Sequence, residues 1–98
     1  MKNNPIIVGI DPGYDRVGIA IGQKNDSTWQ VLAHTCIQTD KKAHLFKRYA
    51  QIAKELEALI IKYQVTEAGI ESLFWFKNQS TALDVSEARG VIIATLLR

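Results

Sequence analysis

The chain has 98 residues, of which 47% are hydrophobic and 22% charged, and its formal net charge is +2. These values exclude a disordered chain and predict one globular domain at most. A charge this small does not by itself identify a nucleic acid as partner. The lone Cys36 excludes an internal disulfide, and no apolar run is long enough for a membrane span. We therefore expect a cytoplasmic protein without a membrane partner.

The sequence opens with a predicted hairpin. Residues 6–10 are apolar and mostly β-branched, which is typical of a strand buried on both faces. Residues 11–15 supply Asp, Pro and Gly for a turn. Residues 16–22 form a second predicted strand, in which Val and Ile alternate with small residues.

A third strand is predicted over residues 29–36, after a polar turn. Its alternation places Val31, Ala33 and Thr35 on one face and Leu32 on the other. Because consecutive strands with short connections usually pair with each other, we expect all three strands to be antiparallel neighbours.

A long amphipathic helix is predicted over residues 41–63, since its apolar residues recur at steps of three or four. Asp40 is the expected residue at or near its N-cap, and Lys62 complements the dipole at its end. Residues 67–71 form a short strand, and a second helix runs from Ser80 or Thr81 to the last residue. The pattern predicts an α/β fold in which the fourth strand is parallel to the first.

Asp11 is the sharpest candidate for a functional residue. It ends an apolar strand and is followed at once by Pro12 and Gly13. An ionised carboxylate beside a core costs several kcal/mol unless a partner compensates for the lost water. The alternative is a turn-forming Asp that caps its own backbone, and the sequence leaves both readings open.

Glu71 is the second candidate, because it ends the short strand that follows the long helix. In a strand–helix–strand unit the new strand commonly lies beside the first, which would bring Asp11 and Glu71 within roughly 5 Å. Two carboxylates at that separation repel each other unless a cation lies between them, and oxygen ligands suit Mg²⁺ or Mn²⁺. The alternative is a Glu at an exposed strand end.

Residues 74–76 are three consecutive aromatics, followed by Lys77. They cannot all enter one core from a loop, so we expect at least one to be exposed or to stack on a flat partner such as a base. Packing of some of them under the second helix is the alternative.

Three blocks of the chain resemble the RuvC family of Holliday junction resolvases. They are residues 9–13 with 16–18, residues 70–71 with 74, 77–78 and 82–83, and residues 87–91. The first block is shared widely among RNase H-like proteins, whereas the three in this order are specific to the family.

The resemblance implies an incomplete RNase H-like fold, with residues 1–98 as the N-terminal part of one nuclease domain. It implies a homodimer that binds four-way DNA junctions and uses Mg²⁺, with Mn²⁺ as a substitute. The implied roles are as follows: Asp11 and Glu71 as catalytic metal ligands, Phe74, Lys77 and Arg16 as DNA contacts, and Leu83, Ala88, Val91 and Ile92 as the dimer interface.

The family completes its site with two further acidic residues on a later helix that these 98 residues do not contain. The expected function is therefore a metal-dependent, structure-selective DNA endonuclease of recombination and repair that is inactive as this chain alone. A catalytically inactive DNA-binding or dimerisation module is the first alternative. Half of an actin-like ATPase or sugar kinase is the second.

Overall fold

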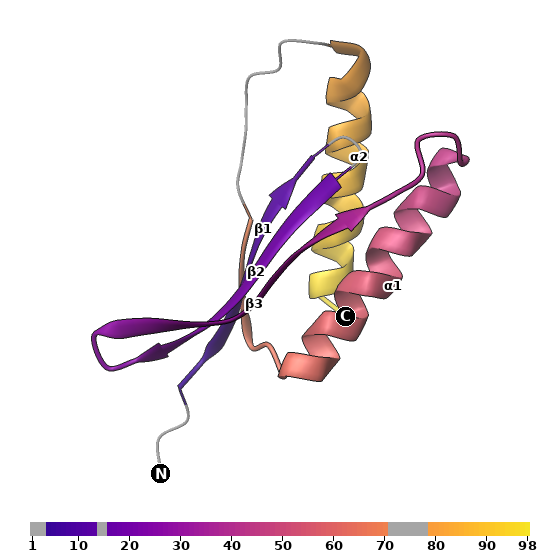
Figure 1. The fold of residues 1–98 in the computed structure, drawn as a ribbon. Coiled ribbons are helices and arrows are strands. Elements are labelled where there is room, and N and C mark those ends of the chain that lie inside the picture. Colours follow the sequence, from indigo (N-terminus) through magenta and orange to yellow (C-terminus); the bar gives the residue numbers. More distant parts are fainter. Residues whose placement is uncertain (1–3, 14–15, 71–78) are drawn as a thin grey trace.

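The computed structural model describes residues 4–13, 16–70 and 79–98, and of residues 79–85 only the helical backbone. The elements follow the predicted order (Figure 1). They are β1 (Ile6–Pro12), β2 (Arg16–Asn25), β3 (Thr28–Gln38), α1 (Leu45–Tyr63), β4 (Glu67–Ile70) and α2 (Gln79–Leu96).

The four described strands form one mixed sheet in the order β3-β2-β1-β4. β1 pairs antiparallel with β2, and β2 pairs antiparallel with β3. β4 lies on the other side of β1 and is parallel to it, so α1 is the crossover that connects β3 to β4. The predicted arrangement of three antiparallel strands, a helix, a parallel fourth strand and a second helix is confirmed.

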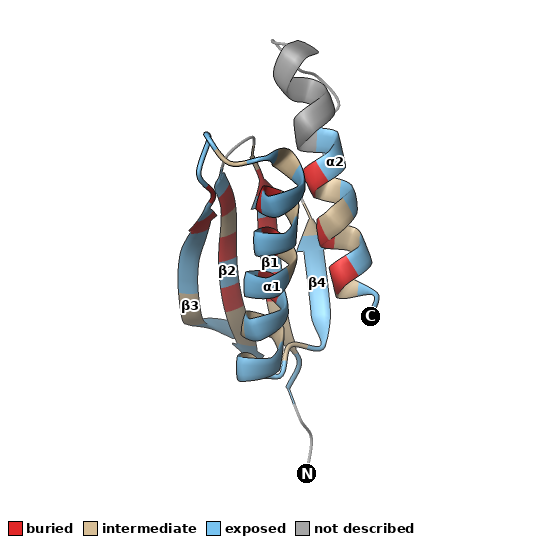
Figure 2. Cartoon of the chain, turned by 90° about the vertical axis from the view of Figure 1, so that its right-hand side faces the viewer, coloured by how far each residue is buried: buried red, intermediate tan, exposed pale blue. Residues whose placement is uncertain are grey.

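Both helices cover the same face of the sheet, and the core lies between them and the strands (Figures 1 and 2). Alternate residues of β2 turn inward because side chains on a strand point to opposite faces in turn. The core consists of Val8, Ile10, Val17, Ile19, Ile21 and Ile37 from the sheet and Ile52, Leu56, Ala88 and Ile92 from the helices.

The long helix begins four residues later than predicted. Its N-cap is His44, whose Nδ1 accepts a hydrogen bond of 3.1 Å from the backbone N–H of Phe46. Asp40 instead accepts a bond of 2.9 Å from the backbone N–H of Lys42, within a turn that precedes the helix. The prediction of Asp40 as the cap itself is therefore wrong, whereas Lys62 lies in the last turn as expected.

A charged side chain is buried where α1 meets the end of β3. Arg48 is only 4% exposed, and its Nε donates a hydrogen bond of 3.0 Å to the hydroxyl of Thr39, itself 5% exposed. A buried guanidinium must be hydrogen-bonded to avoid a large desolvation cost. This pair therefore fixes the first turns of α1 against the sheet.

The third strand does not alternate as predicted. Ile21 pairs with Ala33 but the next residue, Gly22, pairs with Val31, so the strand carries a bulge at Leu32. Because Ile21 and Gly22 point to opposite faces, Val31 and Ala33 do as well. The prediction that they share a face is wrong, and Val31 is 68% exposed.

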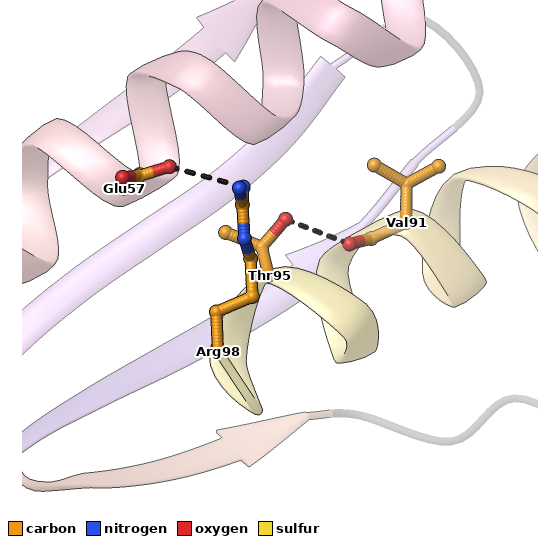
Figure 3. Close-up of polar contacts among 4 residues, drawn as sticks. All are labelled: Glu57, Val91, Thr95 and Arg98. Atoms are coloured by element: carbon orange, nitrogen blue, oxygen red, sulfur yellow. Dashed lines mark hydrogen bonds and ion pairs between the residues drawn. The ribbon is translucent and has the colours of Figure 1, made fainter.

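The C-terminal end of α2 is tied to α1 by a salt bridge (Figure 3). The Arg98 guanidinium lies 3.2 Å from a carboxylate oxygen of Glu57, and the buried Thr95 hydroxyl donates to the Val91 carbonyl at 2.8 Å. The salt bridge is largely exposed and adds little stability. In the described part of the chain, no helix is long and apolar enough to cross a membrane.

Candidate functional site

Asp11 lies on the face of the sheet that neither helix covers. It is the sixth residue of β1, exposed, and paired with Gly18 of β2. Its neighbours Ile10 and Pro12 point the other way and are buried. A Cβ built on Gly18 would lie 3.6 Å from the Cβ of Asp11, so a glycine here leaves open space beside the carboxylate.

The turn that follows Asp11 requires a glycine. A Cβ built on Gly13 would overlap the carbonyl oxygen of Arg16, so any other residue forces the backbone of the turn to shift. The turn-forming role and the proposed functional role therefore belong to different residues of this segment. The tight turn depends on Gly13, and the Asp11 carboxylate is left exposed on the strand.

The parallel pairing of β4 brings the sequence before Glu71 beside the sequence before Asp11. The described register joins Gly9 to Gly69 and Ile10 to Ile70. Asp11 and Glu71 are the residues that follow Ile10 and Ile70 in the sequence. Glu71 lies outside the described residues, as do Phe74 and Lys77, so their predicted roles stay predictions.

A shallow hollow of about 410 Å³ lies on the open face next to Asp11. Its floor includes Gly9, Gly18 and Ala20, and His34 of β3 lies at its far side. The sequence interpretation did not single out these small residues, although Gly and Ala alternate with Ile along β2 and signal a face with no side chains to bury.

The described part of the chain holds one acidic residue of the predicted site. No group of three or more His, Cys, Asp or Glu residues among the described ones could hold a metal ion. Among the described residues, the salt bridge found joins Arg98 to Glu57. The Asp11 carboxylate has no lysine or arginine partner among those residues. A single open carboxylate at a strand end suits a hard cation, but it needs further oxygen ligands.

Arg16, the predicted DNA contact, is exposed at the first position of β2 and pairs with Gln38. It lies on the same face as Asp11, because Arg16 and Gly18 are two residues apart on one strand and Gly18 pairs with Asp11.

Two residues of the predicted dimer interface lie in the core of the chain. Ala88 is 1% exposed and Ile92 is 0% exposed, and both pack with core residues of the sheet. Val91 is half-buried, and the side chain of Leu83 lies outside the described ones. The dimer interface stays a prediction.

The sequence was compared with known proteins. The family described as "Crossover junction endodeoxyribonuclease RuvC" matches residues 7–98. A curated relative of that description from Petrotoga mobilis is 41% identical over 91 residues, which are 93% of this chain and 56% of the relative. The chain therefore spans little more than half the length of the curated relative.

The fold was compared with solved structures. Thermus thermophilus RuvC, in a structure described as a complex with a Holliday junction substrate, gives a TM-score of 0.88 at 17% identity. The match covers 95% of this chain and 57% of that one, and it confirms the RNase H-like fold. An Aquifex aeolicus PPX-GPPA enzyme gives a TM-score of 0.62 at 15% identity, over 95% of this chain and 32% of its own.

Proposed function

The chain belongs to the RuvC family of crossover junction endodeoxyribonucleases, and we propose that it supplies the amino-terminal half of a metal-dependent site that cuts four-way DNA junctions. The observation that carries the proposal is the pairing of Ile10 with Ile70, one residue before Asp11 and Glu71. If this parallel register continued by one step, the two carboxylates would lie on adjacent strands.

Adjacent strands lie about 4.8 Å apart, so a pair of carboxylates there could share one divalent cation. The oxygen-only donor set favours Mg²⁺, with Mn²⁺ as a substitute. When bound, such a cation polarises a phosphodiester and lowers the pKa of a bound water. The role of this chain is to hold the two carboxylates at fixed strand ends. Gly18 keeps the space beside Asp11 free for the DNA phosphate.

The remaining roles follow the resemblance. Arg16 lies on the face of Asp11 and is positioned to contact a DNA phosphate, while Phe74 and Lys77 are proposed to contact the junction. A homodimer through the α2 residues Leu83, Ala88, Val91 and Ile92 and a cytoplasmic location remain proposals. Cleavage is proposed for the whole domain, in which the resemblance implies two further acidic residues beside Asp11 and Glu71.

Manganese binding to the chain tests the site, with Asp11→Asn as the variant and Asp26→Asn as its matched control. Asp26 is also an exposed aspartate, and it lies in the turn that follows β2. We expect Mn²⁺ to broaden the amide NMR signals of Ile10 and Gly18, since a paramagnetic ion at Asp11 lies beside both. The signal of Asn25 should stay sharp.

Asp11→Asn should remove the broadening, and Asp26→Asn should leave it unchanged. The metal site is refuted if Ile10 and Gly18 stay sharp at millimolar Mn²⁺, or if Asp11→Asn broadens like the parent. Glu71→Gln should weaken the effect as well, because the proposal gives the ion two carboxylates. If it does not, Asp11 binds the ion without Glu71.

A further inference from the structure

The tip of the β2–β3 hairpin projects beyond the rest of the sheet (Figure 1). The pairing of β1 with β2 ends at Ile6 and Gln23, whereas the pairing of β2 with β3 continues to Asn25 and Thr28. A two-stranded extension of this kind exposes both of its faces to solvent. Its side chains are available for contact with another molecule.

The hairpin tip carries an exposed tryptophan beside a lysine. Trp29 is 57% exposed and pairs directly with Lys24, so both side chains leave the same face of the hairpin. A Cβ built on Gly22 would lie 3.6 Å from the Cε3 atom of the indole ring. The ring therefore lies close to a glycine, with much of its surface exposed, and Lys24 is its cross-strand partner.

Local hydrogen bonds hold this tip in place. The Asn25 side chain donates to the Gln30 side chain at 3.3 Å and accepts from that of Asn4 at 3.2 Å. The Thr28 hydroxyl donates to the Asn25 carbonyl at 3.0 Å. An aromatic residue on a pre-organised hairpin loses little conformational freedom on binding, which favours its use in recognition.

Trp29 and Asp11 lie on one face of the sheet. Asp11 pairs with Gly18, Trp29 pairs with Lys24, and residues 18, 20, 22 and 24 of β2 all point to that face. Six residues of a strand span about 20 Å at about 3.3 Å each. Duplex DNA rises about 3.4 Å per base pair, so this distance equals about six base pairs.

Small residues line β2 on the face between the two ends, and the charged side chains that β2 places there are basic. Gly18, Ala20 and Gly22 form its middle on β2, with Arg16 and Lys24 at the two ends. Phosphate contacts by Arg and Lys position a protein along a duplex, and an indole packs on a sugar or base edge. Among possible partners, an extended polyanion fits two cations set so far apart on one face of the sheet.

We infer that Trp29 and Lys24 bind a duplex arm of the DNA junction about six base pairs from the phosphate held at Asp11. The inference rests on the proposed function, because it takes Asp11 as the point where the DNA strand is held. It assigns the hairpin tip, which the family's motifs do not include, to a DNA contact outside the active site.

The test measures binding of the chain to four-way junctions in Ca²⁺, with arms of about 20 base pairs or arms shortened to about 4 base pairs by closing loops. Trp29→Ala should weaken binding to the long-armed junction about five- to tenfold, as removal of a stacking aromatic does. It should change binding to the short-armed junction less than twofold. Trp29→Phe should restore most of the affinity.

The matched control is Phe46→Ala, since Phe46 is 71% exposed on α1, which covers the opposite face of the sheet. It should leave both affinities unchanged.

Lys24→Gln should lower the slope of log K against log salt by about one, as expected for one lost phosphate contact. In a Trp75→Phe background, Trp29 is the remaining tryptophan, and long arms should quench its fluorescence more than short arms.

The outcomes separate the two proposals. If the parent chain binds neither junction better than a linear duplex, the proposed function fails. If it binds junctions normally but Trp29→Ala and Phe46→Ala behave alike on long arms, only the hairpin contact fails. If Trp29→Ala instead abolishes self-association in sedimentation without changing DNA binding, the tip is a protein interface and the inference is overturned.

Discussion

Replacement of Ile92 by alanine distinguishes a core residue from a dimer contact. The side chain is 0% exposed and packs in the core of the chain. The change removes three carbon atoms, worth about 2.4 kcal/mol in transfer free energy, and the cavity left behind adds about 1–2 kcal/mol. We therefore expect the free energy of unfolding to fall by about 3.4–4.4 kcal/mol, a large part of a small domain's total.

The assay is urea unfolding followed by far-ultraviolet circular dichroism at two protein concentrations. The control is Leu97→Ala, which removes the same number of carbons from a side chain that is 80% exposed, and it should change the stability by less than about 0.5 kcal/mol. A core residue gives a loss that is independent of concentration. A loss under about 1 kcal/mol, or one that shrinks on dilution, would show that Ile92 does not lie in the core of one chain.

Two further substitutions test the local geometry. Gly13→Ala should lower the melting temperature, because the added Cβ overlaps the Arg16 carbonyl oxygen. Gly90→Ala has open space around its Cβ and should raise the helix stability by about 0.5–1 kcal/mol. Equal melting temperatures for the two variants would contradict the turn geometry. His44→Ala should lower the free energy of unfolding by about 1 kcal/mol, because it removes the hydrogen bond from the Phe46 N–H. His44→Asn should retain most of that stability in thermal unfolding. An Asn variant as unstable as the Ala variant would argue against the cap.

Most of the fold could be predicted from local periodicity. The alternation of apolar residues along β2 is typical of a strand and excludes a helix. The apolar stripe of α1 is typical of a helix and excludes a strand. These periodic features depend on neighbouring residues, and a single sequence displays them directly. The place of β4 does not follow in the same way, because it lies beside β1 and not beside β3, the strand that precedes the helix.

The errors arose where tertiary contacts override local signals. Asp40 has the residue type of a helix cap, but its carboxylate accepts a hydrogen bond from the Lys42 N–H in a preceding turn. The N-cap of the helix is His44. The bulge at Leu32 is set by how β3 bends against β2, which an alternating pattern cannot show. Arg48 resembles a solvent-facing residue until Thr39 is found beside it in the core.

The burial of two predicted dimer residues could not be read from the sequence for a related reason. Ala88 and Ile92 were assigned to an interface from the resemblance, and a helix with one apolar face gives no sign of whether its own sheet or a partner covers that face. The side that α2 turns to the sheet is fixed by the Ile and Val residues of β1 and β2, which need a cover. Only the assembled fold decides between the two.

The second strand shows how one short pattern serves both stability and function. Its β-branched residues Val17, Ile19 and Ile21 face the helices and build the core, while the residues between them are glycine or alanine. Large side chains in those positions would fill the hollow beside Asp11 and cover the floor that leads to Trp29. Because the two faces alternate residue by residue, a one-residue slip of β2 would empty the core and block the open face together. The register of β2 is therefore the structural requirement on which both the carboxylate site and the proposed hairpin contact depend.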